Sequence, residues 1–183
     1  IMIAIQDPLR DRGNAGNILF SSPFGVHCKD YRNQRRECMM KFIEAIWKIA
    51  KERKIKVIFY LTDLIKFFCN GKDSSFKILE NNNLKINKTF KPILCKEIDI
   101  FKPNLILCMG NKAIENLLGQ KVAFWDKSHK YNGIPVLPSI HIAGTACYGW
   151  KDTLGEKPQT ATAKAEYIYR EIEYMILLNS NDK

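Results

Sequence analysis

Residues 92–119, PILCKEIDIFKPNLILCMGNKAIENLLG, hold the alternation of elements that decides the fold. The stretch 92–102 fits a helix with a proline in its first turn, where the missing N–H needs no intrahelical partner. The apolar run NLILCMG (104–110) follows as a strand, and NKAIENLLG (111–119) follows as a second helix, which Gly119 ends. A strand between two helices is typical of a parallel sheet covered by helical layers.

The same alternation continues in both directions along the chain. Further strands are predicted at 1–5, 56–61 and 134–140, and further helices at 33–54 and 157–178. We therefore predict an α/β fold: a three-layer sandwich with a central four-stranded, mainly parallel sheet flanked by helices. No repeat or linker interrupts the pattern, so residues 1–183 are expected to form a single domain.

The composition is that of a globular and strongly basic protein. Hydrophobic residues make up 46% of the chain and charged residues 26%, which argues against disorder. The formal net charge of +10 favours a polyanionic partner, nucleic acid first and an anionic membrane surface second, although it also serves solubility. No apolar run reaches the roughly 18 residues of a membrane span, so neither secretion nor membrane insertion is expected. Residues 70–88, rich in Asn, Lys and Ser, are expected to form a long loop of the kind that often lines a functional site.

The six cysteines are scattered and form no metal-ligand motif. No CxxC or CxxxC pair occurs, so the spacing predicts no zinc or cluster site. Cys95 and Cys108 lie inside apolar runs, where a reduced thiol packs as a small hydrophobic side chain. We therefore expect reduced cysteines, a cytoplasmic or nuclear location, and no metal or organic cofactor.

Polar side chains follow three of the predicted strands at their carboxyl ends. Asp7 follows the first strand, Thr62 and Asp63 follow the second, and His141 follows the last. A single acid in such a position is usually a turn or helix cap, and a lone histidine is as often a hydrogen-bonded core residue. Ligands bind at this edge of open parallel sheets, however, so the three together predict an active site there.

Residues 5–21, IQDPLRDRGNAGNILFS, resemble the first motif of uracil-DNA glycosylases, which reads approximately GQDPYHGPGQAHGLAFS. The two align without a gap and match at Gln6, Asp7, Pro8, Gly13, Ala15, Phe20 and Ser21. VIFYLTDLIK (57–66) is similar to the family's second strand and its exit, often YITNLVK, and PVLPSIHIAG (135–144) is similar to the last motif, where a strand runs into HPS. Residues 92–119 resemble the superfamily's helix, proline, strand, Gly and Ala, so the resemblance covers nearly the whole chain in the right order.

This resemblance implies hydrolysis of a base–deoxyribose bond in DNA by a monomer without a cofactor. Breaking that bond builds positive charge on the sugar and negative charge on the departing base. By resemblance, Asp7 stabilises the sugar cation and orients or deprotonates a water, and His141 donates a hydrogen bond to the base oxygen. Phe20 stacks on the flipped-out base, and the backbone N–H of Gln6 helps bind the base oxygen. From the residues alone, Phe20 is better explained as core filling, and His141 equally well as a core histidine.

Two departures from the family pattern bear on which base is accepted. Leu9 stands where the family has a tyrosine that blocks bases carrying a 5-methyl group, which leaves the exclusion of thymine open. Asp63 stands where the family usually has an asparagine, whose donor and acceptor match uracil O4 and N3–H. We hypothesise that Asp63 reads a base edge with two adjacent donors or is protonated in the pocket. The alternative is that Asp63 caps a turn and the base is read elsewhere.

Contacts to the DNA backbone are implied near the first and last motifs, at Arg10, Ser21, Ser22, Ala143 and Gly144. A second group could meet phosphates or form a solvated helix face: Lys29, Arg32, Arg35 and Arg36. The family often inserts an apolar wedge after the last motif; no leucine stands there, and Tyr148 and Trp150 are candidates. The iron–sulfur branch of the superfamily needs four cysteines, but Phe67 and Phe90 stand at the later positions and the first pair is absent.

The predicted function is therefore that of a DNA glycosylase acting on uracil or a related damaged or modified base. One alternative is a catalytically impaired relative that binds DNA or a flipped base, which the substitutions at positions 9, 63, 142 and 143 favour. The other is an unrelated nucleotide-binding or transferase domain of similar α/β build, whose helix start at Gly110–Asn111 could accept a phosphate, although no P-loop or GxGxxG is present. The base itself and the preference for single or double strands are left open by the sequence.

Overall fold

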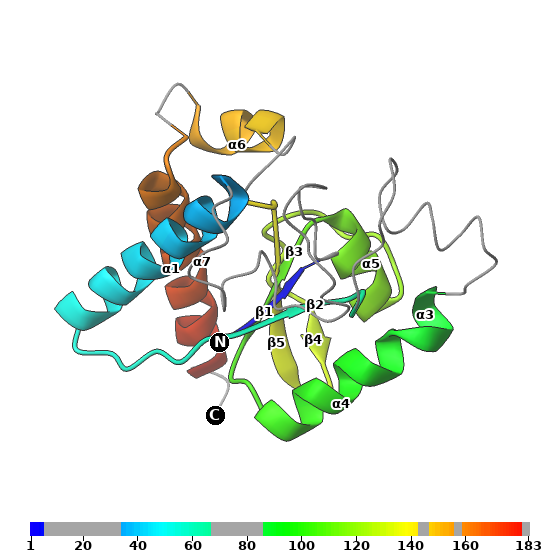
Figure 1. Ribbon diagram of the computed structural model, residues 1–183. Coiled ribbons are helices and arrows are strands. Elements are labelled where there is room, and N and C mark those ends of the chain that lie inside the picture. Colours follow the sequence, from blue (N-terminus) through cyan, green and yellow to red (C-terminus); the bar gives the residue numbers. More distant parts are fainter. Residues whose placement is uncertain (6–33, 67–85, 143–146, 156–158, 181–183) are drawn as a thin grey trace.

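A computed structural model describes residues 1–5, 34–66, 86–142, 147–155 and 159–180 of the chain (Figure 1). Its sheet has five strands: β1 (Met2–Ile5), β2 (Tyr60–Asp63), β3 (Ile106–Met109), β4 (Lys130–Tyr131) and β5 (Ile134–Ser139). The strands are ordered β2-β1-β3-β5-β4, and all neighbours run parallel except the β4–β5 pair. The helices are α1 (Gln34–Glu52), α3 (Ile86–Thr89), α4 (Lys91–Phe101), α5 (Asn111–Leu118), α6 (Cys147–Leu154) and α7 (Ala161–Ser180).

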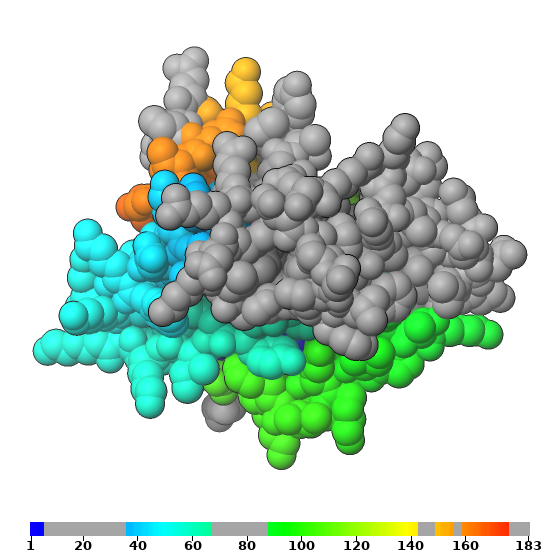
Figure 2. All heavy atoms as spheres, in the orientation of Figure 1, coloured from blue at the N-terminus to red at the C-terminus, as the bar shows by residue number. Residues whose placement is uncertain are grey.

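Helices cover the sheet on both faces, so the predicted three-layer α/β sandwich is confirmed (Figure 1). Alternate residues of each strand point to opposite faces. In β1, Ile3 and Ile5 pack with α1 and α7, whereas Met2 and Ala4 pack with α4 and α5. The outer surfaces of α1 (cyan) and α4 (green) are both visible in the space-filling view, on different sides of the molecule (Figure 2). The strands are thus buried on both faces, which is why they read as continuous apolar runs.

The sheet has one more strand than the four predicted, because β4 adds a short antiparallel edge. Asn132 and Gly133 connect β4 to β5 with φ values of +48° and +80°. Two successive residues with positive φ form the type I′ turn that suits a two-residue hairpin, and Asn-Gly is the favoured pair for it. The sequence therefore contained a signal for this hairpin that the prediction did not use.

The second strand begins later and ends later than the predicted range 56–61. Its neighbour β1 starts at Met2, which is paired with Tyr60, so residues before Tyr60 have no ladder to join. The amino group of Ile1 donates to the Ile58 carbonyl at 2.8 Å. Because Thr62 and Asp63 pair with Ala4 and Ile5, they are the last residues of β2, whereas the sequence had predicted that they lie beyond it.

The remaining boundaries follow local signals closely. Gly119 ends α5 in the left-handed conformation with φ of +78°, and its N–H donates to the Glu115 carbonyl. The last helix begins at Ala161 and not at 157, because the Thr160 hydroxyl accepts the N–H of Ala163 at 3.1 Å, as an N-cap does. The predicted loop 70–88 ends in the short helix α3, and α6 was not predicted. Within the described ranges, no helix is long and apolar enough to cross a membrane.

Candidate active site

The carboxyl ends of the four parallel strands lie at one edge of the sheet. Asp63 at the end of β2 is in register with Ile5 at the end of β1, and Met109 at the end of β3 is in register with Ser139 in β5. The strand that follows β1 in the chain, β2, lies on one side of the β1–β3 pair, and the strand that pairs with β3 on the other side is β5. Such a switch in direction opens a crevice between the two strand ends, which is where ligands bind in this class of fold.

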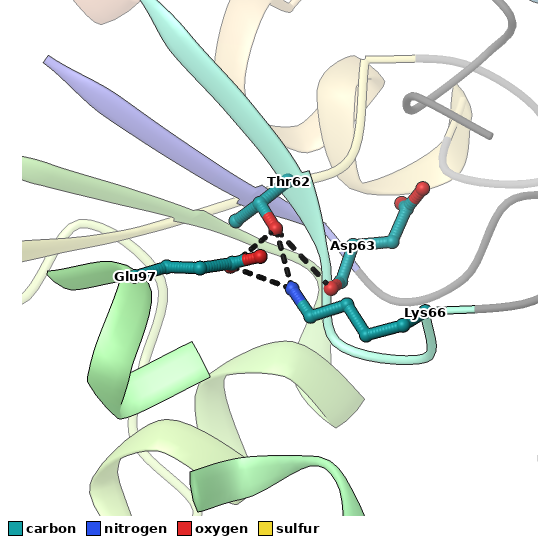
Figure 3. A network of polar contacts seen from close by, with 4 residues as sticks. All are labelled: Thr62, Asp63, Lys66 and Glu97. Carbon is teal, nitrogen blue, oxygen red and sulfur yellow. Dashed lines mark hydrogen bonds and ion pairs between the residues drawn. The ribbon is translucent and has the colours of Figure 1, made fainter. Parts of the chain in front are cut away.

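Asp63 is placed at this edge, as predicted. The residue is 4% exposed, and the ladder continues past it because the N–H of Leu64 donates to the Ile5 carbonyl at 2.7 Å. Its carboxylate points away from the neighbouring Thr62 side chain, as successive residues of a strand do (Figure 3). Asp63 thus belongs to the strand that pairs with β1. Its register partner, Ile5, stands two residues before Asp7 in the sequence.

A polar network fixes the other side of the β2 end. Lys66 Nζ lies 2.6 Å from both Thr62 Oγ1 and Glu97 Oε2, and Thr62 Oγ1 donates to Glu97 Oε2 at 2.7 Å (Figure 3). Glu97 comes from α4, so the network ties that helix to the strand. Burial, and then the nearby Glu97 carboxylate, raise the pKa of Tyr60 above its ordinary value. Sequence reasoning singled out Thr62 but missed Lys66 and Glu97, because their meeting depends on how α4 packs.

His141 lies two residues beyond β5, at the same edge, and is half-buried. The indole Nε1 of Trp150 donates to the His141 carbonyl at 2.9 Å. A side-chain carbon added at Gly110 would lie 3.9 Å from the Cβ of His141, so the end of β3 and the start of α5 adjoin this histidine. Gly110 has φ of +91°, a conformation that favours glycine, and its N–H donates to the Ser139 carbonyl at 2.8 Å.

Trp150 is fully buried, which corrects its candidacy as a wedge that enters DNA. Its ring packs against Trp125 and Tyr167 at centroid distances of 5.5 and 6.2 Å. The residue belongs to the core, and its N–H donates to the His141 carbonyl. The side chain of the other candidate, Tyr148, is outside the described part of the chain.

Most of the other predicted site residues lie outside the described residues and stay predictions: Gln6, Asp7, Leu9, Arg10, Phe20, Ser21, Ser22, Ala143 and Gly144. Lys29, Arg32, Phe67 and the side chain of Arg35 also lie outside the described residues. Arg36 is half-buried and so does not belong to a fully solvated face, and Phe90 is a core residue at 2% exposure. His129 lies away from the edge, with Nε2 3.1 Å from Asp126 Oδ2.

Two of the described cysteines are buried or half-buried thiols with a raised pKa. Cys108 is fully buried in β3, where burial raises the pKa of its thiol far above the usual range. Cys38 is half-buried, and burial raises the pKa of its thiol as well. Among the residues that the structure describes, no three His, Cys, Asp or Glu side chains gather where they could hold a metal ion.

The protein is thus of the α/β class, with Asp63 and His141 at the carboxyl edge of its sheet, near the ends of β1 and β3. The sequence model of the uracil DNA glycosylase superfamily matches residues 1–169, and the chain therefore belongs to that superfamily. No individual curated protein matches it. Membership supports a DNA-glycosylase type of function in general, with DNA as the substrate, and it excludes the alternative of an unrelated nucleotide-binding domain.

Proposed function

We propose that the protein is a DNA glycosylase that hydrolyses the N-glycosidic bond of a flipped-out uracil, or of a related damaged or modified base. The observation that carries the proposal is the placement of Asp63 and His141 at the edge where β1 and β3 end. The family match spans these residues and the segment that holds Asp7. No metal or organic cofactor enters the proposed reaction.

In the proposed reaction the C1′–N bond breaks, and the departing base takes the bonding electrons. Asp7, two residues beyond Ile5, stabilises the positive charge on the sugar and orients the water whose oxygen bonds to C1′. The proton that this water loses passes to the Asp7 carboxylate, and the departing base anion finally takes up one proton. His141 donates a hydrogen bond to the base oxygen on which negative charge develops. The base reaches these groups by leaving the stack, and Phe20 supports its face while the N–H of Gln6 binds its oxygen.

Asp63 reads the base edge in this proposal, and its burial makes the reading strict. Asp63 is 4% exposed, so bulk water cannot supply a hydrogen bond to a base group that fails to match its carboxyl. An ionised carboxylate accepts from two adjacent donors, whereas a protonated carboxyl matches the O4 acceptor and N3–H donor of uracil. The substrate is therefore a base with one of these two edges. Leu9 contributes a wall without a phenol, so a 5-substituent is tolerated better than beside tyrosine.

The second candidate function is a catalytically impaired relative that binds DNA or a flipped base. The net charge of +10 suits DNA binding whether or not cleavage occurs, and the residues at positions 9, 63, 142 and 143 depart from the family motifs. Both candidates bind DNA, and only the first produces an abasic site.

A glycosylase panel tests the proposal. Single- and double-stranded oligonucleotides carry uracil, 5-substituted uracils, thymine, hypoxanthine, xanthine or cytosine, and alkali reveals abasic sites. Wild type runs beside Asp7→Ala and His141→Ala, with His129→Ala as the matched control because that histidine lies away from the edge. Cleavage of one base that is lost in the first two variants and kept in the third supports the proposal. No cleavage of any base, with DNA binding intact, supports the non-catalytic relative.

A further inference from the structure

The backbone that carries His141 is held at two successive carbonyls by side chains from two different helices. Trp150 on α6 donates from Nε1 to the His141 carbonyl at 2.9 Å, and Lys164 on α7 donates from Nζ to the Ile142 carbonyl at 2.8 Å. The thiol of Cys38 on α1 also lies 3.5 Å from the Ile142 carbonyl. This segment follows β5 and has no strand ladder of its own, so side-chain donors fix its course.

Lys164 is the less expected of the two donors, because a lysine ammonium is rarely buried unless it is paired. The residue is 8% exposed, and its Nζ lies 5.6 Å from the centre of the Trp150 ring, where a cation is attracted to the π face. A hydrogen bond from an ionised donor is shorter and stronger than one between neutral groups. The buried charge is therefore placed where it can orient the Ile142 carbonyl.

Trp150 brings a rigid donor to the neighbouring carbonyl. Its side chain is fully buried, and its ring meets Trp125 at a tilt of 58° and Tyr167 at 88°. Packed on several sides, the indole cannot turn its N–H elsewhere without opening the core. The His141 carbonyl is thus aimed by a donor that the core holds still.

We infer that Lys164 and Trp150 are positioning residues for His141. They fix the two peptide units on which the imidazole is mounted, beside Gly110 and the start of α5, and they act on the reaction only through that histidine. The inference rests on the proposed function in one respect, since it takes His141 as the hydrogen-bond donor to the leaving base. A misplacement of about 1 Å in such a donor can slow a reaction by about 100-fold.

Two variants remove one donor each while keeping most of the packing. Lys164→Met keeps the apolar stem and loses the ammonium, and Trp150→Phe keeps an aromatic ring and loses the N–H. The matched controls are Lys48→Met, at an exposed lysine of α1, and Trp47→Phe, which removes an indole bond to the Val57 carbonyl. Lys164→Arg is the conservative variant, which keeps a charged donor. If Lys164→Met does not fold, Trp150→Phe carries the test.

The first measurement is amide hydrogen exchange of residues 140–142 in the free protein, which needs no activity. We expect exchange at least about tenfold faster in both variants and unchanged in both controls, because local opening exposes the segment. The second measurement is single-turnover cleavage of the best base in the panel. We expect rates about 10- to 100-fold lower, with DNA affinity within about twofold of wild type and partial rescue by Lys164→Arg.

The decisive comparison combines each variant with His141→Ala. If Lys164 and Trp150 act through His141, their substitution lowers the cleavage rate no further in that background. An equal further loss there, or unchanged exchange of residues 140–142, overturns the inference. Absence of cleavage by the wild type would instead contradict the proposed function, and the exchange measurement would still decide whether the two side chains hold the segment.

Discussion

Asp63 and Ile5 face each other in the parallel ladder at the carboxyl edge of the sheet. Because the chain continues from Ile5 to Gln6 and Asp7, the pairing fixes a buried acid beside the strand from which the proposed catalytic motif departs. The two acids have different environments along the chain: Asp63 belongs to a strand, whereas Asp7 follows one. This relation is compatible with the proposal that Asp63 reads the base and that Asp7 acts on the sugar.

Replacing Asp63 by asparagine should change which base is cut. An amide offers a donor to O4 and an acceptor to N3–H, so we expect the rate for uracil, relative to the base preferred by wild type, to rise at least about tenfold. Competition between two labelled oligonucleotides in the glycosylase panel measures the ratio. Asp99→Asn, at an exposed aspartate of α4, is the control. A wild type that already prefers uracil, with a ratio that Asp63→Asn leaves unchanged, would show that Asp63 does not read the base as an ionised carboxylate.

The Lys66–Glu97 pair should matter more for stability than an exposed pair elsewhere. The Lys66 and Glu97 side chains are 15% and 22% exposed and share the Thr62 hydroxyl. Removing the carboxylate with Glu97→Gln leaves a half-buried ammonium short of its acceptor, and we expect the free energy of unfolding to fall by about 1–3 kcal/mol.

Urea unfolding of Glu97→Gln, Lys66→Met and the double variant measures this. The double variant should lose less than the sum of the single losses, because it leaves no unpaired charge. Arg53→Met provides the comparison: its pair with Glu173 has an Arg side chain 49% exposed, and such pairs contribute about 0–1 kcal/mol. Additive losses at Lys66 and Glu97 would mean that the two groups are not coupled.

The parts of the fold that the sequence predicted are those set by local signals. The helix, strand and helix of residues 92–119 are as expected, since apolar periodicity, an early proline and Gly119 act within a few residues of themselves. The start of β2 was wrong because it depends on where β1 begins, and β1 lies more than fifty residues earlier. A register is a property of two strands, so one strand's composition cannot give it.

The candidate site divides in the same way. His141 and Asp63 could be predicted because they follow or end apolar runs, and the order of strands then brings them to one edge. Lys164 and Trp150 could not, because their hydrogen bonds to Ile142 and His141 depend on how α6 and α7 return to the sheet. In the sequence, Lys164 is one lysine of a basic chain, and only its burial at 8% exposure distinguishes it.

Stability should fall at alkaline pH because of the buried thiol in β3. Burial raises the pKa of Cys108 far above the usual range, whereas in the unfolded chain the thiol ionises near about pH 8.5. Below that pH both states keep the proton and stability is unaffected. Above it the unfolded chain loses a proton that the folded chain keeps, so stability falls by up to about 1.4 kcal/mol per pH unit as pH rises toward the folded pKa.

Urea unfolding across about pH 7 to 10 measures this slope. In Cys108→Ala the decline should be shallower, whatever the loss of packing does to the absolute value. Cys38→Ala should flatten it less, because that thiol is half-buried and Lys164 and Lys41 counter the rise in its pKa. If Cys108→Ala left the slope unchanged, the difference in thiol protonation between the folded and unfolded chains would not be the cause of the decline.

DNA affinity should depend steeply on salt, and a lysine beside the site should contribute to that dependence. Lys112 is exposed in the first turn of α5, directly after the Gly110–Asn111 corner that adjoins His141. With four phosphates neutralised, affinity falls about 100-fold between about 50 and 200 mM salt.

Lys112→Met should weaken binding of every DNA sequence alike and reduce the slope of log affinity against log salt by about 1. Lys48→Met, on the outer face of α1, removes the same charge away from this edge and should leave the slope unchanged. Equal changes in the two variants would mean that the net charge of +10 acts as a whole and that DNA does not dock at this edge.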